Sequence, residues 1–296
     1  MRKFQGMLLD INNNCNIRCK FCINEWSKVG KTVYMESKTF DKALSLLPLV
    51  SRGFMSCSAE STIHPDFIEL FKKIPRNTGA YTFITTNLSR YLSDEEIEDI
   101  SNLKLDAISI SIGSLKAEVY EELHAGSKFS TFISNLDRLS GVCKQKANAP
   151  RLRFITVALK QNIGDLEYMA KTCFEDYDPL MHQFRTPFTY TIKIKKKDWL
   201  DRSIPSREEW NRVSGALGKL HCGDIQFFNP LYPEPSKPGK KKVNTYFSFR
   251  ADGKIEFHDK KYDMIDEGLP IEFRKDFNIN DIEKPYEFFK EGLAKI

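Results

Sequence analysis

Short hydrophobic and β-branched runs alternate along the chain with segments of helical periodicity. The strand-like runs occupy residues 6–11, 54–59, 81–87, 107–113, 151–159 and 188–194. The helix-like segments between them occupy residues 37–50, 65–74, 93–101, 130–144 and 164–176. Strands that alternate with helices in this way predict βαβ units and a parallel sheet.

The strand-like runs are apolar at nearly every position, which is typical of strands covered on both faces. Six such units predict an α/β fold, a partial (β/α)6 TIM-like barrel in which functional residues follow the carboxyl ends of the strands. Two helix start signals support the helical segments. Ser93 precedes Glu96 by three residues, as in a capping box, and Pro65 suits a first helical position.

The last hundred residues have a different pattern. A helix is predicted from about Ser206, proline-rich connections follow, and Asp252-Gly253 between two alternating runs predicts a β-hairpin. We therefore expect a core domain over residues 1–200 and a small C-terminal α+β cap over residues 201–296. The cap is expected to bind substrate and to cover the mouth of the barrel.

Composition is ordinary for a globular protein, with 41% hydrophobic and 29% charged residues in 296. No run is long enough to suggest a membrane span, and the first residues lack the apolar core of a secretion signal, so a cytoplasmic location is expected. The net charge of +5 includes lysine-rich runs at 193–199 and 237–242. These runs are interpreted as solvated segments or as binding surfaces for nucleic acid or an acidic peptide.

Three of the seven cysteines, Cys15, Cys19 and Cys22, lie within eight residues directly after the first strand-like run. A structural zinc site usually has two paired half-sites, and the second is missing here, so its fourth ligand would have to come from elsewhere in the chain, for example His64. Buried thiols are a second alternative, but the loop is rich in polar residues. Three thiolates can instead hold three irons of a [4Fe–4S] cluster and leave the fourth iron open to a small molecule. The pattern favours the cluster.

The spacing "CNIRCKFC" resembles the CxxxCxxC motif of the radical S-adenosylmethionine (radical SAM) superfamily. "SAES" at 58–61 is similar to the family's GGEP element, and "ITTNLS" at 84–89 to its ITTNG segment. Residues 108–139 resemble a further stretch of the family. The resemblance extends over residues 4 to about 195.

This resemblance implies a [4Fe–4S] cluster and S-adenosylmethionine as cofactors, and an external one-electron reductant such as flavodoxin or ferredoxin. The implied reaction is reductive cleavage to a 5′-deoxyadenosyl radical, which abstracts hydrogen from a peptide or small-molecule substrate. The resemblance assigns the cluster to Cys15, Cys19 and Cys22. It places S-adenosylmethionine near Phe21, Ser58, Ala59, Glu60, Asn87, Ser111 and His124.

Two departures from the family pattern concern the residues placed near S-adenosylmethionine. Ser58 and Ala59 replace glycines, which is acceptable if neither position needs a positive φ. His124 stands where the family usually has an arginine. It is interpreted either as a hydrogen-bond donor to the methionine carboxylate or as a surface histidine.

The C-terminal hairpin resembles the SPASM and Twitch extensions of related enzymes, but no cysteine follows Cys222. Cys57, Cys143 and Cys173 are expected in the core and not on a second cluster. Without an auxiliary electron acceptor, a redox-neutral reaction such as epimerisation or rearrangement is favoured. Cys222 is interpreted as a hydrogen donor to the substrate radical or as a buried or idle thiol. The alternative function is a non-catalytic cluster or zinc protein that binds nucleic acid through its lysines.

Overall fold

The computed structural model describes residues 4–22, 24, 29–56, 58–187, 197–229, 246–258 and 277–294. Its strands form one sheet in the order β10-β9-β8-β1-β2-β3-β4-β5-β6-β7. The parallel strands are β1 (Gly6–Leu9), β2 (Arg52–Phe54), β3 (Tyr81–Thr86), β4 (Ala107–Ser111), β5 (Arg151–Val157), β6 (Met181–Arg185) and β7 (Ile225–Phe228). This is the predicted α/β fold of a partial TIM-like barrel.

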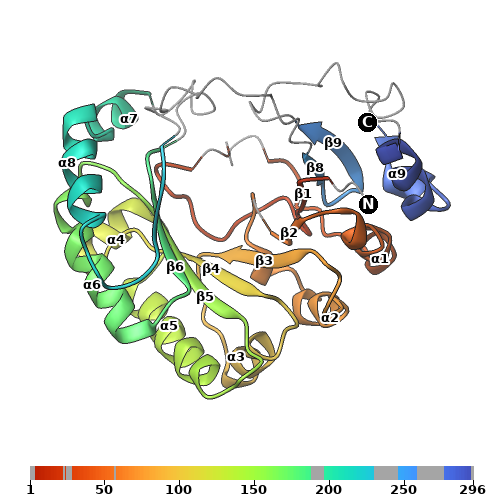
Figure 1. Cartoon of the computed structure of the whole chain (residues 1–296), viewed down its shortest axis with the longest axis horizontal. Coiled ribbons are helices and arrows are strands. Elements are labelled where there is room, and N and C mark those ends of the chain that lie inside the picture. Colours follow the sequence, from red (N-terminus) through yellow and green to blue (C-terminus); the bar gives the residue numbers. More distant parts are fainter. Residues whose placement is uncertain are drawn as a thin grey trace.

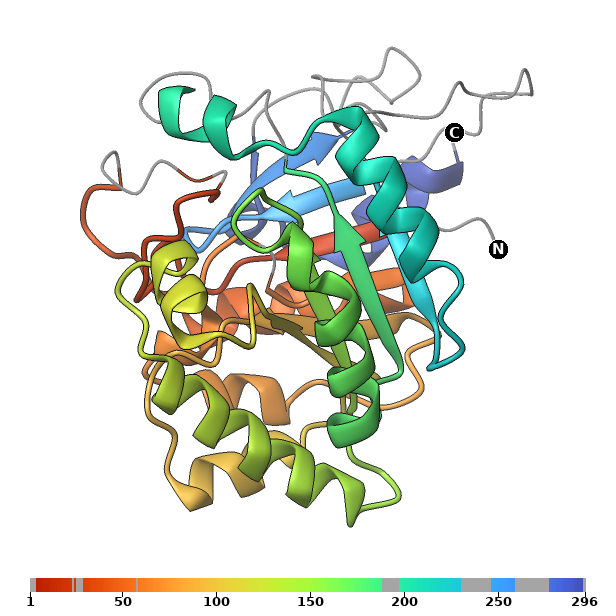
Figure 2. The ribbon, with the colours of Figure 1, turned by 90° about the vertical axis from the view of Figure 1, so that its left-hand side faces the viewer.

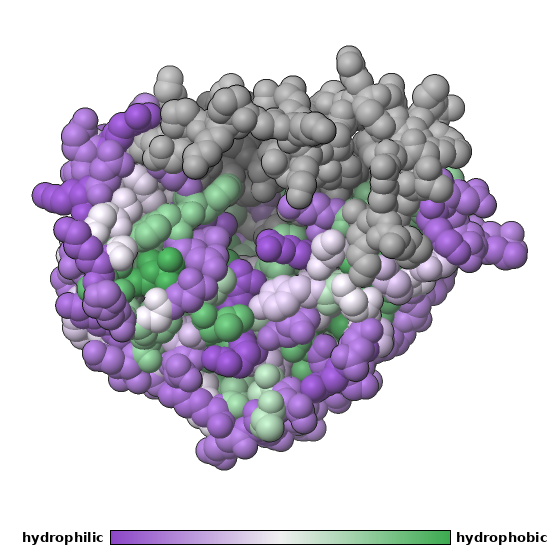
Figure 3. All heavy atoms as spheres, in the orientation of Figure 1, coloured by the Kyte–Doolittle hydropathy of each residue, from purple (hydrophilic) through white to green (hydrophobic). Residues whose placement is uncertain are grey.

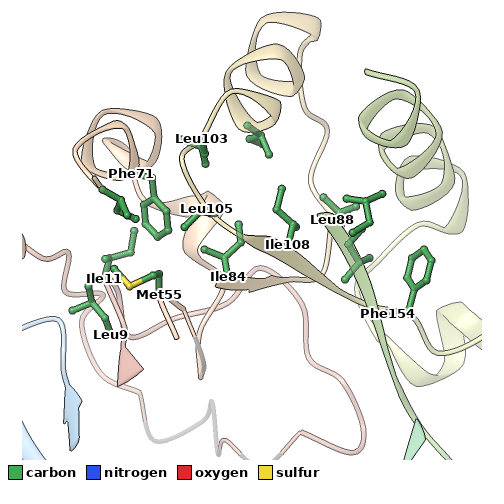
Figure 4. Close-up of a cluster of buried hydrophobic side chains, with 14 of the residues drawn as sticks. Leu9, Ile11, Met55, Phe71, Ile84, Leu88, Leu103, Leu105, Ile108 and Phe154 are labelled. Atoms are coloured by element: carbon green, nitrogen blue, oxygen red, sulfur yellow. The ribbon is translucent and has the colours of Figure 1, made fainter. Parts of the chain in front are cut away.

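The sheet curves, and helices cover its outer side (Figure 1). They are α1 (Ser37–Leu44), α2 (Phe67–Lys72), α3 (Asp94–Ser101), α4 (Ala117–Leu123), α5 (Phe129–Lys144), α6 (Leu166–Tyr177), α7 (Lys197–Ser203), α8 (Arg207–Leu217) and α9 (Pro285–Ala294). The main core lies between sheet and helices, where Ile84, Ile108 and Phe154 point from the strands toward the helices (Figure 4). Polar residues dominate the outer rim, while the face is hollowed near its centre (Figure 3).

Three strands differ from the sequence prediction. The second strand, β2, is Arg52–Phe54, so it overlaps the predicted run at 54–59 only at Phe54. The sixth strand is Met181–Arg185, whereas the predicted run at 188–194 lies outside the described residues. β7 was not predicted. Strand β6 was missed because His182, Gln183 and Arg185 make it look polar, although His182 is fully buried and lies 2.8 Å from the hydroxyl oxygen of Thr156.

The predicted helices are present with shifted ends. Helix α2 begins at Phe67, so the prediction that Pro65 is its first residue was wrong by two positions. Helices α4, α7 and α9 were not predicted. Helix α8 begins after Ser206, as expected, and both Ser206–Glu209 and Ser93–Glu96 form capping boxes.

Replacing Ser93 with alanine should lower the free energy of unfolding by about 1 kcal/mol, because the Glu96 amide loses its capping acceptor. The hydroxyl oxygen of Ser93 accepts that N–H at 3.1 Å, and the Glu96 carboxylate accepts the Ser93 N–H at 2.9 Å. Urea denaturation measures the change. A Ser45→Ala variant on the exposed end of α1 serves as control, and equal losses in both variants would contradict the assigned cap.

The C-terminal hairpin is formed by β8 (Tyr246–Phe249) and β9 (Lys254–His258), and its turn contains Asp252-Gly253 as predicted. Gly253 has a φ of 83°, which favours glycine. β8 pairs in parallel with β1, so the hairpin extends the barrel sheet at its β1 edge. β9 also pairs with the short strand β10 (Phe277–Asn278).

Among the described residues, no helix is long and apolar enough to cross a membrane.

Candidate functional site

The loop that carries the three cysteines follows β1 and lies at the carboxyl ends of the parallel strands (Figure 2). Its backbone pairs with the segment that ends α4. The Arg18 N–H donates to the Ala125 carbonyl at 2.8 Å, and the Lys20 N–H donates to the Leu123 carbonyl at 3.0 Å. The loop is therefore anchored beside the end of β4 and the helix that follows it.

Cys15 lies beside Asn87, which follows β3. The Asn87 side-chain amide donates to the Cys15 sulfur at 3.4 Å and to the Asn16 side chain at 3.0 Å. Burial, and after it the nearby Glu60 carboxylate, raises the pKa of Cys15 to about 12. A thiolate at this position therefore needs positive charge beside it, which bound iron supplies.

Cys19 lies beside His124, whose Nδ1 is 3.4 Å from the Cys19 sulfur. The His124 ring is 1% exposed, stacks on Tyr120, and meets the Phe21 ring edge-on with centroids 5.4 Å apart. Burial lowers the pKa of His124 to about 4, which favours the neutral ring. The histidine is therefore not at the surface, and its Nε2 has no hydrogen-bond partner among the described residues.

Gly113, two residues after the end of β4, provides the space for the His124 ring. A Cβ at this position would lie 2.6 Å from His124 Nε2. The Gly113→Ala variant should therefore displace the ring from Cys19 and lower the free energy of unfolding by about 1–3 kcal/mol.

Denaturation measures this effect, and Gly141→Ala is the matched control. Gly141 lies within α5, and a Cβ there would meet nothing within 4 Å. Alanine in a helix interior should raise stability there by about 0.5–1 kcal/mol. If both alanine variants raised the free energy of unfolding, or both lowered it, the predicted clash between a Cβ at position 113 and the His124 ring would be contradicted.

Glu60 connects the ends of three strands. Its side chain accepts hydrogen bonds from the hydroxyls of Thr62 and Thr86 at 2.8 and 2.7 Å, and from the Asn87 N–H at 2.7 Å. Its backbone N–H donates to the Asn14 carbonyl at 3.1 Å. Burial raises the pKa of Glu60, while these hydrogen bonds act in the opposite direction. The carboxylate thereby holds the loops after β1, β2 and β3 together.

Ser58 and Ala59 lie on the loop after β2. The Ser58 N–H donates to the Asp10 carboxylate at 2.9 Å, and the Ala59 carbonyl accepts from the Ser56 hydroxyl at 3.1 Å. Neither residue is among the described non-glycine residues with positive φ. Ser58 and Ala59 therefore meet the condition expected for these positions, since neither needs a positive φ.

The remaining predicted residues separate into two groups. Ser111 ends β4 at the same edge of the sheet as the cysteine loop. Cys222 lies before β7, and because β7 is parallel to β6, this loop is at the opposite, amino end of the strands (Figure 2). Cys222 therefore lies away from the cysteine loop, which contradicts its predicted role as a hydrogen donor at the mouth.

The helical cysteines have the predicted core positions. Cys173 is buried in α6, and Cys143 on α5 packs partly buried against the core. Cys57 lies outside the described residues, as do residues 237–242 and most of the run at 193–199.

Sequence reasoning missed Asp10 and Gly113. Asp10 follows β1, is nearly buried, and lies 3.9 Å from Arg250 at the end of β8. It thus joins the loop at Ser58 to the C-terminal hairpin. A carboxylate at the end of an apolar strand was the available signal. Nothing in the sequence indicated the role of Gly113, because that role depends on the His124 ring, eleven residues later, packing against it in the fold.

The site's donor set fits a cluster. Among the described residues, no three Cys, His, Asp or Glu side chains are gathered as ligands of one metal ion. A [4Fe–4S] cluster does not require three ligands around one ion, because each of its three thiolates binds a different iron. The thiols of Cys15, Cys19 and Cys22 are all partly exposed on one loop.

Comparison with known proteins agrees with this arrangement. The family model for the radical SAM superfamily matches residues 9–173, more than half of the chain. A GTP 3′,8-cyclase from Cyanothece sp. is 30% identical over 129 residues, which cover 42% of this chain and 39% of that protein. The enzyme of the same name from Haemophilus influenzae (strain PittEE) is 23% identical over 173 residues, with 56% and 48% covered. The matched regions thus span less than half of these relatives.

Among solved structures, Streptococcus suis SuiB bound to S-adenosylmethionine matches with a TM-score of 0.67 and 15% identity. The match covers 98% of this chain and 67% of SuiB, and at this identity it shows the fold alone. The family model, in contrast, covers the cysteine loop and the ends of the strands around it. The chain therefore belongs to the radical SAM superfamily, which implies a [4Fe–4S] cluster and S-adenosylmethionine as its cofactors.

Proposed function

We propose that this chain cleaves S-adenosylmethionine reductively and carries out a redox-neutral modification, such as epimerisation or rearrangement, of a peptide or small metabolite. The observation that carries the proposal is the meeting of the cysteine loop, Glu60, Asn87 and His124 at one end of the parallel strands. When bound, the cluster and S-adenosylmethionine supply an electron and a 5′-deoxyadenosyl radical that abstracts hydrogen.

The protein's part is to hold and orient these groups. Cys15, Cys19 and Cys22 are the proposed iron ligands. Asn87 and His124 contact the sulfurs of Cys15 and Cys19, so they fix the positions of two of the three ligands. Polar groups that contact cluster ligands in this way tune a cluster as well as place it.

The proposed S-adenosylmethionine site lies around the same loop. Ser58 and Ala59 offer an unstrained backbone to the methionine group, and Glu60 keeps this backbone in place beside Asn87. Phe21 provides a ring for the adenine, and Ser111 lies at the neighbouring strand end. An external one-electron reductant such as flavodoxin or ferredoxin would deliver the electron.

The proposed division of labour places the radical chemistry in residues 1–200 and substrate binding partly in residues 201–296. The contact of Arg250 with Asp10 supports this, because it joins the hairpin directly to the loop at the mouth. SuiB, which shares the fold, has been solved with a precursor peptide, which supports a peptide among the candidate substrates.

A redox-neutral outcome is proposed because the described cysteines outside the loop are not gathered for a second cluster: Cys143 and Cys173 pack in the core, and Cys222 lies at the amino end of the strands. The test incubates the reconstituted protein with S-adenosylmethionine, reductant and an extract of small peptides and metabolites in D2O. Products should keep the mass of their substrates, apart from deuterium gained from solvent. Products that lack a pair of hydrogens would contradict this part of the proposal.

A further inference from the structure

The inner face of the curved sheet carries polar side chains that the site described above does not use. Side chains alternate between the two faces of a strand. Ile108 and Phe154 point outward to the helices (Figure 4), so Ser109 on β4 and Arg153 on β5 point inward. These two residues are also direct partners in the sheet register. They therefore lie side by side inside the half-barrel.

Both residues have a buried polar atom that lacks a partner. The Ser109 side chain is fully buried, and its hydroxyl has no hydrogen-bond partner among the described residues. The same holds for the buried Nε of Arg153. A buried polar group without a partner is destabilising, so it is uncommon in native proteins unless a ligand or water completes it.

The Arg153 guanidinium is held in place by aromatic rings. Its carbon lies 4.6 Å from the centre of the Phe83 ring and 6.0 Å from that of Tyr81, whose hydroxyl also hydrogen-bonds the guanidinium. Rings hold a guanidinium by cation–π attraction without accepting the Nε hydrogen. The side chain is thus oriented in advance, and its Nε donor remains available.

The charge balance around Arg153 favours an anion. Burial is the main cause that lowers the pKa of Arg153, and the neighbouring Arg52 on β2 acts in the same direction. Tyr81 acts in the opposite direction more strongly than Arg52 does, and the Asp224 carboxylate before β7 also opposes the lowering, as the weakest of these influences. A second negative group beside Arg153 would relieve the repulsion between the two arginines.

The position suits a substrate. Along β4, Ser109 precedes Ser111 by two residues, which is roughly 7 Å of strand. Ser111 lies at the mouth, so Ser109 lies one inward-facing layer deeper in the half-barrel. The guanidinium of Arg153 lies deeper still, over Phe83, which pairs with Ala107 at the start of β4. A molecule anchored here by one end would need to extend past Ser111 to reach the cysteine loop at the mouth.

We propose that Ser109 and Arg153 form a subsite for an anionic group of the substrate, a carboxylate or a phosphate. The Ser109 hydroxyl and the Arg153 Nε–H donate to oxygens of this group. The inference rests on the proposed function, because it takes the interior of the half-barrel as the place where substrate binds. It narrows the substrate to molecules that carry a negative group at one end.

The test is an NMR titration of the anaerobically reconstituted protein with its arginine side chains labelled with 15N at Nε. Inorganic phosphate is added in one arm and acetate in the other, at constant ionic strength. S-adenosylmethionine is present throughout, so that its own carboxylate is not the anion detected. The Arg153 signal is assigned from its absence in Arg153→Lys, and the exposed Arg76 signal serves as reference.

We expect a saturable shift of the Arg153 signal, and the arm with the tighter binding identifies the group as phosphate or carboxylate. Ser109→Ala should weaken that binding about tenfold or more, the scale of one charge-assisted hydrogen bond. Ser140→Ala is the matched control, because Ser140 also has a buried hydroxyl without a partner but lies on α5, outside the sheet. It should leave the binding unchanged.

An Arg153 signal that moves no more than that of Arg76 would overturn the subsite. Equal anion binding in Ser109→Ala and in the unaltered protein would overturn it as well. Neither result depends on reduction or on 5′-deoxyadenosine, so failure of the subsite is distinguishable from failure of the proposed function.

Discussion

Replacing Cys15, Cys19 and Cys22 together with alanine should remove nearly all iron from the anaerobically reconstituted protein, which should otherwise hold about four irons per chain. Alanine has no ligand atom, and the three thiols lie on one partly exposed loop. The core between sheet and helices does not include them. The variant should therefore stay folded while it loses the cluster and its visible absorption.

Iron analysis and circular dichroism separate these two effects. The control replaces Cys143 and Cys222, which lie on α5 and before β7, away from the mouth. It should keep about four irons. A triple variant that retains its iron would show that other residues hold it. About eight irons in the unaltered protein would reveal a second cluster and overturn the interpretation of the remaining cysteines.

Replacing Glu60 with alanine should produce the largest loss of stability among single substitutions at the site, about 3–5 kcal/mol. The Thr62 and Thr86 hydroxyls and the Asn87 N–H would each lose a buried acceptor. Each unsatisfied buried donor is destabilising by about 1–3 kcal/mol. Since Asn87 also contacts Cys15, binding of S-adenosylmethionine should weaken too.

Urea denaturation and equilibrium binding of S-adenosylmethionine measure these losses. Glu122→Ala is a suitable control, because Glu122 forms an exposed ion pair with Lys20 near the same loop. Exposed pairs contribute about 0–1 kcal/mol, so this variant should remain close to the unaltered protein. If Glu60→Ala were as stable as Glu122→Ala, Glu60 would not hold the three loops together.

The parallel strands of the barrel were predictable because their apolar runs are long and the helices between them are amphipathic. The exceptions have a physical reason. β6 has a buried histidine and an inward-facing polar side, so its sequence does not look like a strand. β7 is an edge strand with mostly exposed side chains, and its place in the sheet depends on pairing with β6.

The candidate site was only partly predictable from the order of strands and helices. The cysteines and Glu60 lie in the loops that follow β1 and β2, as the sequence pattern predicted, although β2 ends at Phe54, earlier than predicted. Cys222 could not be placed, because its end of the sheet depends on the direction of the unpredicted β7. The burial of His124 could not be foreseen either, since it results from the tertiary approach of Gly113. Sequence alone predicts which loops meet, but not which side chains within them touch.

The central claim is that this chain cleaves S-adenosylmethionine through a cluster held by Cys15, Cys19 and Cys22. The most direct test supplies dithionite and S-adenosylmethionine to the anaerobically reconstituted protein and measures 5′-deoxyadenosine by chromatography and mass spectrometry. We predict that 5′-deoxyadenosine forms with the unaltered protein and not with the triple alanine variant. A reconstituted protein with about four irons that forms none would contradict the account.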